Sequence, residues 1–171
     1  MKLLFAVLAV SSLHVSCSAT PGDAAMRGRH YEDAAKLFEK VANQGDAMAA
    51  LKLAELYNTR PGLPEDHQKA IAWYKRAVEL GDVRSAWEIA TIYKSGAGNV
   101  PHDDQLAQPW FEKGAEAGHN YSMYDLAEMY AKSSAVPAND VRGLMWLDAV
   151  TTFSEKASPR NEGHLYIIAD R

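Results

Sequence analysis

The sequence predicts an all-α solenoid of antiparallel helix pairs, because three features of the chain recur together. A segment rich in apolar residues begins at Ala34 and returns every 36 or 37 residues. Its apolar residues stand at the spacing i, i+3, i+4 and i+7, which is typical of the buried face of an amphipathic helix. Glycine and proline separate consecutive segments at regular positions. A fixed period of this length is the signature of a repeat array.

The first 19 residues differ from the repeats and predict an export signal. Lys2 precedes an apolar run from Leu3 to Val10, and small residues follow it. This run is shorter than the ~20 residues that a membrane-spanning helix needs. We therefore expect a cleaved signal over residues 1–19 and a mature repeat domain over residues 20–171, located in the periplasm or secreted.

The end of the signal leaves two alternatives open. Cys17-Ser18-Ala19 fits the small-x-small rule of ordinary signal peptidase, which would release a chain beginning at Thr20. The stretch from Leu13 to Cys17 also resembles a bacterial lipobox, in which Cys17 is lipidated and anchors the protein in the envelope. Because Cys17 is the single cysteine of the sequence, a disulfide within the chain is excluded.

Four copies of the recurring segment, here called B segments, predict four helices. They begin at Ala34, Ala70, Ala107 and Gly143. Large residues share two adjacent columns and are expected to fill the space between helix layers. The first column holds Leu37, Trp73, Trp110 and Trp146, and the second holds Phe38, Tyr74, Phe111 and Leu147.

Three copies of a second segment, the A segments, lie between the B segments and predict the partner helices. They read AALKLAELY, SAWEIATIY and SMYDLAEMY, and each ends in tyrosine. Their small column is expected to let neighbouring helices approach closely. It consists of Ala54, Ala90 and Ala127.

Two kinds of joint connect the segments. Gly45-Asp46 and Gly81-Asp82 predict a glycine helix end followed by an aspartate N-cap, and Gly118-His119 is a looser match. The other joint is longer: Pro64, Pro101 and Pro137 stop one helix, and Asp66, Asp103 and Asn139 can cap the next. The joints divide the array into repeat units of about 31–66, 67–103, 104–139 and 140–171. The last unit is incomplete, so we expect the natural array to continue.

Two places depart from the pattern. Before Tyr31 there is room for only a short helix, about Asp23 to Arg29. Pro109 falls inside the third B segment, where an interior proline costs about 3 kcal/mol. We therefore expect a kink there or a late helix start near Gln108.

In these columns and joints, residues 31–150 resemble Sel1-like repeats, which are relatives of tetratricopeptide repeats. The resemblance rests on the tyrosine, the proline, the aspartate cap, the aromatic pair and the Gly-Asp joint of each unit. Alanine stands where the family has glycine, after Leu53, Ile89 and Leu126. The resemblance implies a right-handed α-solenoid in which A segments line the concave face and B segments cover the convex face.

The tetratricopeptide pattern also implies which A-segment side chains face a partner. Counted from Ala47, the fourth, seventh, eighth and eleventh positions are core, and the second, fifth, ninth and twelfth face the groove. The groove residues are Met48, Leu51, Glu55 and Asn58; Arg84, Trp87, Thr91 and Lys94; and Tyr121, Tyr124, Glu128 and Ala131. The large residues at the fifth position could instead pack against the neighbouring repeat.

The chain lacks the sequence motifs of catalysis and of metal or cofactor binding. H-E-x-x-H, C-x-x-C, G-x-S-x-G and G-x-x-x-x-G-K are absent. The net charge is −4 and no basic patch interleaves with aromatic residues, which argues against nucleic-acid binding. We therefore expect no catalytic, cofactor-binding or metal-binding residues.

These observations favour a non-catalytic protein-interaction module. We expect a monomer that binds a peptide or protein on its concave face, as an adaptor or assembly scaffold of the bacterial envelope or outside the cell. One alternative is a cell-wall-related enzyme, since a cysteine-rich branch of the resembled family is linked to β-lactamase activity, although paired cysteines are absent here. Another is a lipoprotein scaffold of a polysaccharide export system.

The two cleavage alternatives differ in one measurable outcome. If Cys17 carries a lipid, bacterial cells expressing the chain will incorporate labelled palmitate into it, and Cys17→Ala will abolish the label. Ser16→Ala is the matched control and should keep the label. A wild-type chain without palmitate would instead support cleavage before Thr20.

Overall fold

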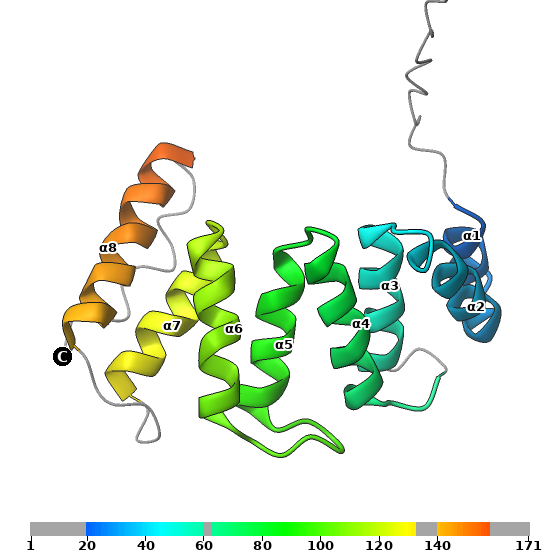
Figure 1. Ribbon diagram of the computed structural model, residues 1–171, viewed down its shortest axis with the longest axis horizontal. Helices are drawn as coiled ribbons and strands as arrows, with labels where there is room; N and C mark the ends of the chain where they lie inside the picture. Colours follow the sequence, from blue (N-terminus) through cyan, green and yellow to red (C-terminus); the bar gives the residue numbers. More distant parts are fainter. Residues whose placement is uncertain (1–19, 60–62, 133–139, 158–171) are drawn as a thin grey trace, which may run out of the picture.

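The computed structural model describes residues 20–59, 63–132 and 140–157, and every regular element in these ranges is an α-helix. The helices stand side by side in one row from α1 to α8 (Figure 1). They are α1 (Pro21–Arg27), α2 (Tyr31–Ala42), α3 (Ala47–Asn58), α4 (His67–Glu79), α5 (Arg84–Ser95), α6 (Asp104–Glu116), α7 (Asn120–Lys132) and α8 (Asp140–Ala157). The predicted export signal with Cys17, and the predicted cap Asn139, lie outside the described residues.

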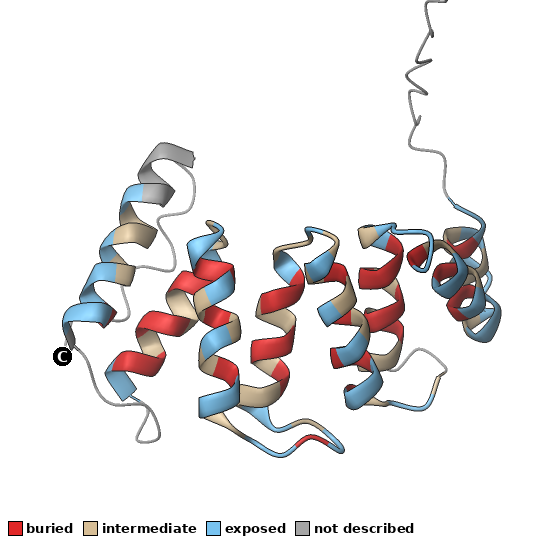
Figure 2. Cartoon of the chain, viewed as in Figure 1, coloured by how far each residue is buried: buried red, intermediate tan, exposed pale blue. Residues whose placement is uncertain are grey.

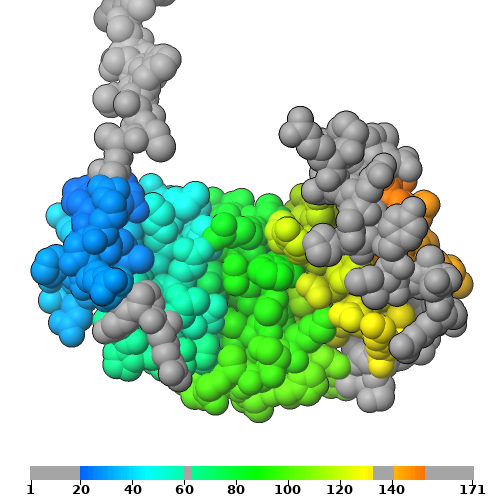
Figure 3. Space-filling view, turned by 180° about the vertical axis from the view of Figure 1, so that it is seen from behind, coloured from blue at the N-terminus to red at the C-terminus, as the bar shows by residue number. Residues whose placement is uncertain are grey.

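The two kinds of segment alternate along the row, which confirms the predicted all-α repeat fold. The A segments form α3, α5 and α7, and the B segments form α2, α4, α6 and α8. Helices pack mainly against the helices that precede and follow them in the sequence. Successive helices therefore appear as adjacent bands across the surface (Figure 3). This nearest-neighbour packing is what distinguishes a solenoid from a globular bundle.

The core lies where the small A column meets the large second B column. Ala54, Ala90 and Ala127 are at most 1% exposed. Tyr74 shares one buried cluster with Ala54, and Phe111 shares a second with Ala90. Buried side chains accordingly lie along the facing sides of the helices (Figure 2). The first B column is less enclosed, since Trp73 and Trp110 pack at the core's edge.

Each short joint ends the preceding B helix in the same way. Gly45, Gly81 and Gly118 have φ of +98°, +100° and +86°, a left-handed conformation that favours glycine. The following backbone N–H reaches back five residues: Asp82 donates to the carbonyl of Ala77 at 2.9 Å. This hydrogen bond and the one from Gly81 to Val78 form a Schellman motif. The predicted glycine helix ends are confirmed.

Aspartate carboxylates then start the next helices. Asp46 accepts from the Ala49 N–H at 2.8 Å, and Asp66 and Asp103 cap α4 and α6 in the same manner. Asp82 accepts from the Ser85 N–H at 2.9 Å, although α5 itself begins only at Arg84. Each of these bonds satisfies an N–H that has no partner within its helix.

Pro109 does not delay its helix, so of the two expectations the late start near Gln108 is wrong, and the kink stays a prediction. The Asp103 cap fixes the first turn, and α6 runs from Asp104 through Pro109 to Glu116. Proline removes one backbone N–H and leaves the carbonyl of Gln105 without its usual partner. Both Gln105 and Pro109 are exposed, so water can satisfy that carbonyl.

The backbone strain at the short joints predicts a specific loss of stability. Gly81→Ala should lower the free energy of unfolding by about 1 kcal/mol, because a side chain disfavours the left-handed conformation. A Cβ at this position would meet no atom within 4 Å, so the loss reports on the backbone alone. Gly81→Asn is the control and should lose less, since asparagine tolerates this conformation. Urea unfolding measures both, and equal losses would contradict the explanation.

Candidate partner-binding surface

The predicted groove residues lie on the three A helices, at their second, fifth, ninth and twelfth positions. We call the accessible members of this set the A-helix surface. Its members are Met48, Glu55, Asn58, Arg84, Trp87, Thr91, Lys94, Tyr121, Tyr124, Glu128 and Ala131.

The second position is the most accessible part of the A-helix surface. Tyr121 is 67% exposed and Met48 is 55% exposed, and Arg84 between them is also exposed. Single exposed apolar side chains are common on protein surfaces, and Val141, Leu144 and Met145 of α8 are exposed to a similar degree, but on the A helices two such side chains share one column. This column is therefore the part of the surface best placed to touch a partner.

Leu51 does not belong to the surface, which corrects its assignment as a partner-binding residue. It is only 3% exposed and lies in the core cluster of the first repeats. Trp87 and Tyr124, in the same column, are half-buried. Leucine is shorter than the two aromatic side chains, which are only partly covered.

Trp87 lies at the seam between α5 and α7. Its Nε1 donates to Asp125 Oδ2 at 2.7 Å, and its ring packs against Tyr121 and His119 with centroid distances of 5.7 and 6.1 Å. His119 and Tyr121 are 5.8 Å apart, so the three rings form one cluster. Offset or tilted aromatic pairs at these distances contribute about 0.5–1.5 kcal/mol each beyond their buried area.

Lys94 extends the seam along the same pair of helices. Its Nζ donates to Asp125 Oδ1 at 3.0 Å and to Glu128 Oε2 at 2.8 Å. Burial alone would lower the pKa of Lys94, but these two hydrogen bonds hold it above its ordinary value. The hydrogen bond from Lys94 in turn lowers the pKa of Glu128. Lys94 and Glu128 are therefore both charged near neutral pH.

A further ion pair links the preceding A helices. Arg84 of α5 pairs with Glu55 of α3, and both side chains are close to half-exposed. An exposed pair of this kind contributes about 0–1 kcal/mol because water screens it. Its main consequence is that the charges of Arg84 and Glu55 neutralise each other within the chain. The A-helix surface therefore carries no large net charge.

His119 and Asp125 contact residues of the A-helix surface, although the sequence pattern did not reveal them. His119 Nδ1 lies 3.0 Å from Ser122 Oγ, and burial, assisted by Arg84, lowers the pKa of its ring. In the other two short joints, the position of His119 is occupied by Asp46 and Asp82. Asp125 occupies the sixth position, where the other A helices have Lys52 and Glu88. A column of such different residues gives no periodic signal.

The described residues offer no arrangement for metal chemistry. Within residues 20–59, 63–132 and 140–157, no group of three or more His, Cys, Asp or Glu side chains could hold a metal ion. His102, next to an aspartate pair, contacts the Lys94 carbonyl through Nδ1, and its Nε2 lies 3.6 Å from Asp104 Oδ1. The helices of this part of the chain are also too short or too polar to cross a membrane.

The model of the Sel1 repeat family matches four stretches of the chain: residues 29–46, 47–82, 83–119 and 120–149. The second and third stretches each contain an A helix followed by a B helix. A curated relative is the ERAD-associated E3 ubiquitin-protein ligase component HRD3A of Arabidopsis thaliana. It is 38% identical over 73 residues, which cover 42% of this chain and 11% of the plant protein.

Solved structures show the same repeat. A Sel1 repeat protein from Oxalobacter formigenes is 30% identical with a TM-score of 0.63, covering 70% of this chain and 49% of that one. The protein c5321, a protective antigen present in uropathogenic Escherichia coli strains, is 25% identical with a TM-score of 0.65, covering 80% and 30%. The chain thus spans about half or less of the length of these relatives.

The lowered pKa of His119 predicts a pH dependence of stability. The folded protein resists a proton that the unfolded chain takes up near pH 6.5, the ordinary pKa of histidine. The free energy of unfolding should therefore fall as the pH drops from about 6.5 toward the lowered folded-state pKa. His119→Asn should flatten this fall, whereas His30→Asn, at an exposed site before α2, should preserve it. Urea unfolding at several pH values tests this, and an unchanged slope in His119→Asn would refute it.

Proposed function

Because the chain belongs to the Sel1 repeat family, whose repeats typically mediate protein–protein interactions, we propose that its A-helix surface binds a peptide or protein partner. In this role the protein is a non-catalytic adaptor or assembly scaffold. The plant relative is a component of a ubiquitin ligase, which supports a role within an assembly. The predicted export signal supports a location in the bacterial envelope or outside the cell.

The observation that carries the proposal is the exposed ring of Tyr121. The ring is accessible on one side and packs against Trp87 and His119 on the other. Trp87 is itself held by its hydrogen bond to Asp125. A partner that contacts Tyr121 therefore meets a ring that is already ordered, so little side-chain entropy is lost on binding. Rigid aromatic residues of this kind dominate the energetics of protein interfaces.

The surrounding charges limit the chemistry of the partner. Lys94 and Glu128 contact each other within the chain, and Arg84 pairs with Glu55. A partner that relied on strong charge attraction would have to displace these pairs. The A-helix surface therefore fits a partner with an apolar or aromatic anchor and a mixed polar rim, bound as an extended peptide or a helix.

Tyr121→Ala should weaken partner capture by at least about tenfold, the loss expected for a central aromatic contact. The stability loss should not exceed what the ring contacts with Trp87 and His119 contribute, about 0.5–1.5 kcal/mol each, and urea unfolding measures it separately. The matched control is Leu106→Ala, which removes a side chain that is 49% exposed on α6, a B helix. The partner is first captured in intact cells by a photo-crosslinking residue at position 121, with position 106 as the control site. Affinities of the purified pair are then compared.

If photo-crosslinking residues at positions 121 and 106 capture the partner equally well, the A-helix surface is not the partner-binding site. A partner whose affinity falls with Leu106→Ala and not with Tyr121→Ala would place binding on the B helices instead.

A further inference from the structure

His119 occupies a position at which the preceding short joint has a carboxylate that accepts hydrogen bonds. Before α5, Asp82 accepts from both the backbone N–H and the hydroxyl of Ser85. Before α7, His119 and Ser122 occupy the same two positions, and Nδ1 of the histidine lies 3.0 Å from the serine Oγ. By the same pattern, Nδ1 accepts the hydroxyl proton. An imidazole nitrogen accepts only while the ring is neutral, whereas an aspartate stays an acceptor down to much lower pH.

The Ser122 hydroxyl is enclosed, so it depends on the bond to His119. Ser122 is 0% exposed, so water does not reach it. Gly114 of α6 packs so closely against it that a Cβ on the glycine would come within 2.2 Å of the serine Oγ. A proton on Nδ1 would turn the acceptor into a donor, and the hydroxyl would have to give up its present bond and reorient in this enclosed space. The local packing therefore favours the neutral ring.

The His119 ring is also one side of the aromatic cluster on the A-helix surface. Its centroid lies 5.8 Å from that of Tyr121 and 6.1 Å from that of Trp87. A partner seated on the exposed ring of Tyr121 therefore lies within reach of His119 and removes water from it. Loss of water disfavours the charged form of an imidazole. A bound partner and a bound proton thus oppose each other at this residue.

The charged groups around the ring come from α5, from the joint before it and from α7. Burial has the largest effect and lowers the pKa of His119, Arg84 lowers it further, and Asp82 and Asp125 raise it. Each of the two carboxylates already accepts two hydrogen bonds from other groups. These bonds would have to break before either carboxylate could pair directly with a protonated ring.

We propose that His119 makes partner binding at the A-helix surface dependent on pH: the partner binds while the ring is neutral and is released as the ring takes up a proton. This inference rests on the proposed function, because it concerns the regulation of the same surface. By linkage, the affinity should fall by up to about tenfold for each pH unit below the folded-state pKa of His119.

The first test needs no partner. NMR spectra of the full chain, recorded from about pH 7.5 to about pH 5, follow the His119 ring, the Trp87 Nε1–H and the Tyr121 ring. All three sets of signals should change with one common midpoint below 6.5, the ordinary pKa of histidine. Signals of Trp87 and Tyr121 that stay constant while His119 titrates would overturn the proposal.

Two variants serve as the matched pair for this titration. His119→Asn keeps an acceptor that does not titrate, so the pH-dependent changes at Trp87 and Tyr121 should disappear. His30→Asn removes an exposed histidine before α2 and should keep them. If His119→Asn does not fold, as judged by thermal unfolding, His119→Asp replaces it, because aspartate is the residue of the other short joints.

The second test uses the partner that the photo-crosslinking residue at position 121 captures. Its affinity for the purified wild-type chain should fall as the pH drops through the midpoint measured by NMR, by up to about tenfold per pH unit. With His119→Asn this fall should be absent, whereas His30→Asn should show it in full. Titration of the partner's own groups affects all three proteins equally, so the ratio of wild-type to His119→Asn affinity isolates the effect of His119.

The outcomes separate the pH control from the proposed function. If a partner binds at position 121 with an affinity ratio that is constant through the midpoint, the function stands and the control by His119 is wrong. If position 121 captures no partner, the proposed function is wrong, and the release of a partner by His119 is wrong with it.

Discussion

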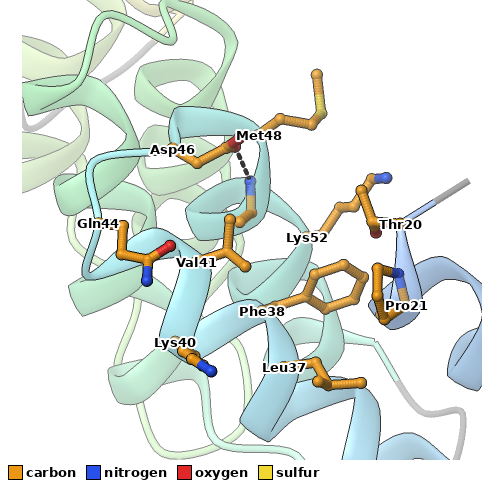
Figure 4. Close-up of a pocket in the computed structure, with 12 residues that line it drawn as sticks. Thr20, Pro21, Leu37, Phe38, Lys40, Val41, Gln44, Asp46, Met48 and Lys52 are labelled. Carbon is orange, nitrogen blue, oxygen red and sulfur yellow. Dashed lines mark hydrogen bonds between the residues drawn. The ribbon is translucent and has the colours of Figure 1, made fainter. Parts of the chain in front are cut away.

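The array depends on close contact between a column of small A-helix residues and a column of large aromatic B-helix residues. Ala54 and Ala90 let the helices approach, and Tyr74 and Phe111 fill the space that remains. One helix pair covers only part of its apolar surface, and the next pair covers the rest. At the N-terminal end of the core, a pocket of about 340 Å³ lies beside Phe38, between α1, α2 and α3 (Figure 4).

The sequence predicted what is local and periodic. Helical spacing located the A and B helices, and the glycine of each short joint marked a backbone conformation that other residues disfavour. Contacts between repeats could not be predicted from the sequence, because they depend on how neighbouring helices are oriented. Leu51 and Trp87 share a column, yet the leucine is buried and the indole reaches the surface. The hydrogen bond from Trp87 to Asp125 joins residues 38 positions apart in the chain.

Some side chains both stabilise the packing between repeats and support the candidate partner-binding surface. Trp87 joins two repeats and at the same time supports the exposed ring of Tyr121. Removing it would therefore disturb the seam and the surface together, and loss of binding alone would not identify a contact residue. Tyr121 is 67% exposed, so its removal should disturb the seam less than removal of Trp87 does. Repeat proteins can vary such exposed positions freely, since the core columns are filled by other residues.

The nearest-neighbour packing of the helices also determines how the chain can acquire its fold. Most contacts join residues that are close in sequence, so only short loops have to close, and proteins with such local contacts fold quickly. An N-terminal repeat can reach its native packing before the C-terminal repeats have been made or have crossed a membrane. For a chain with a predicted export signal, this order of events shortens the time during which apolar helix faces are exposed to aggregation.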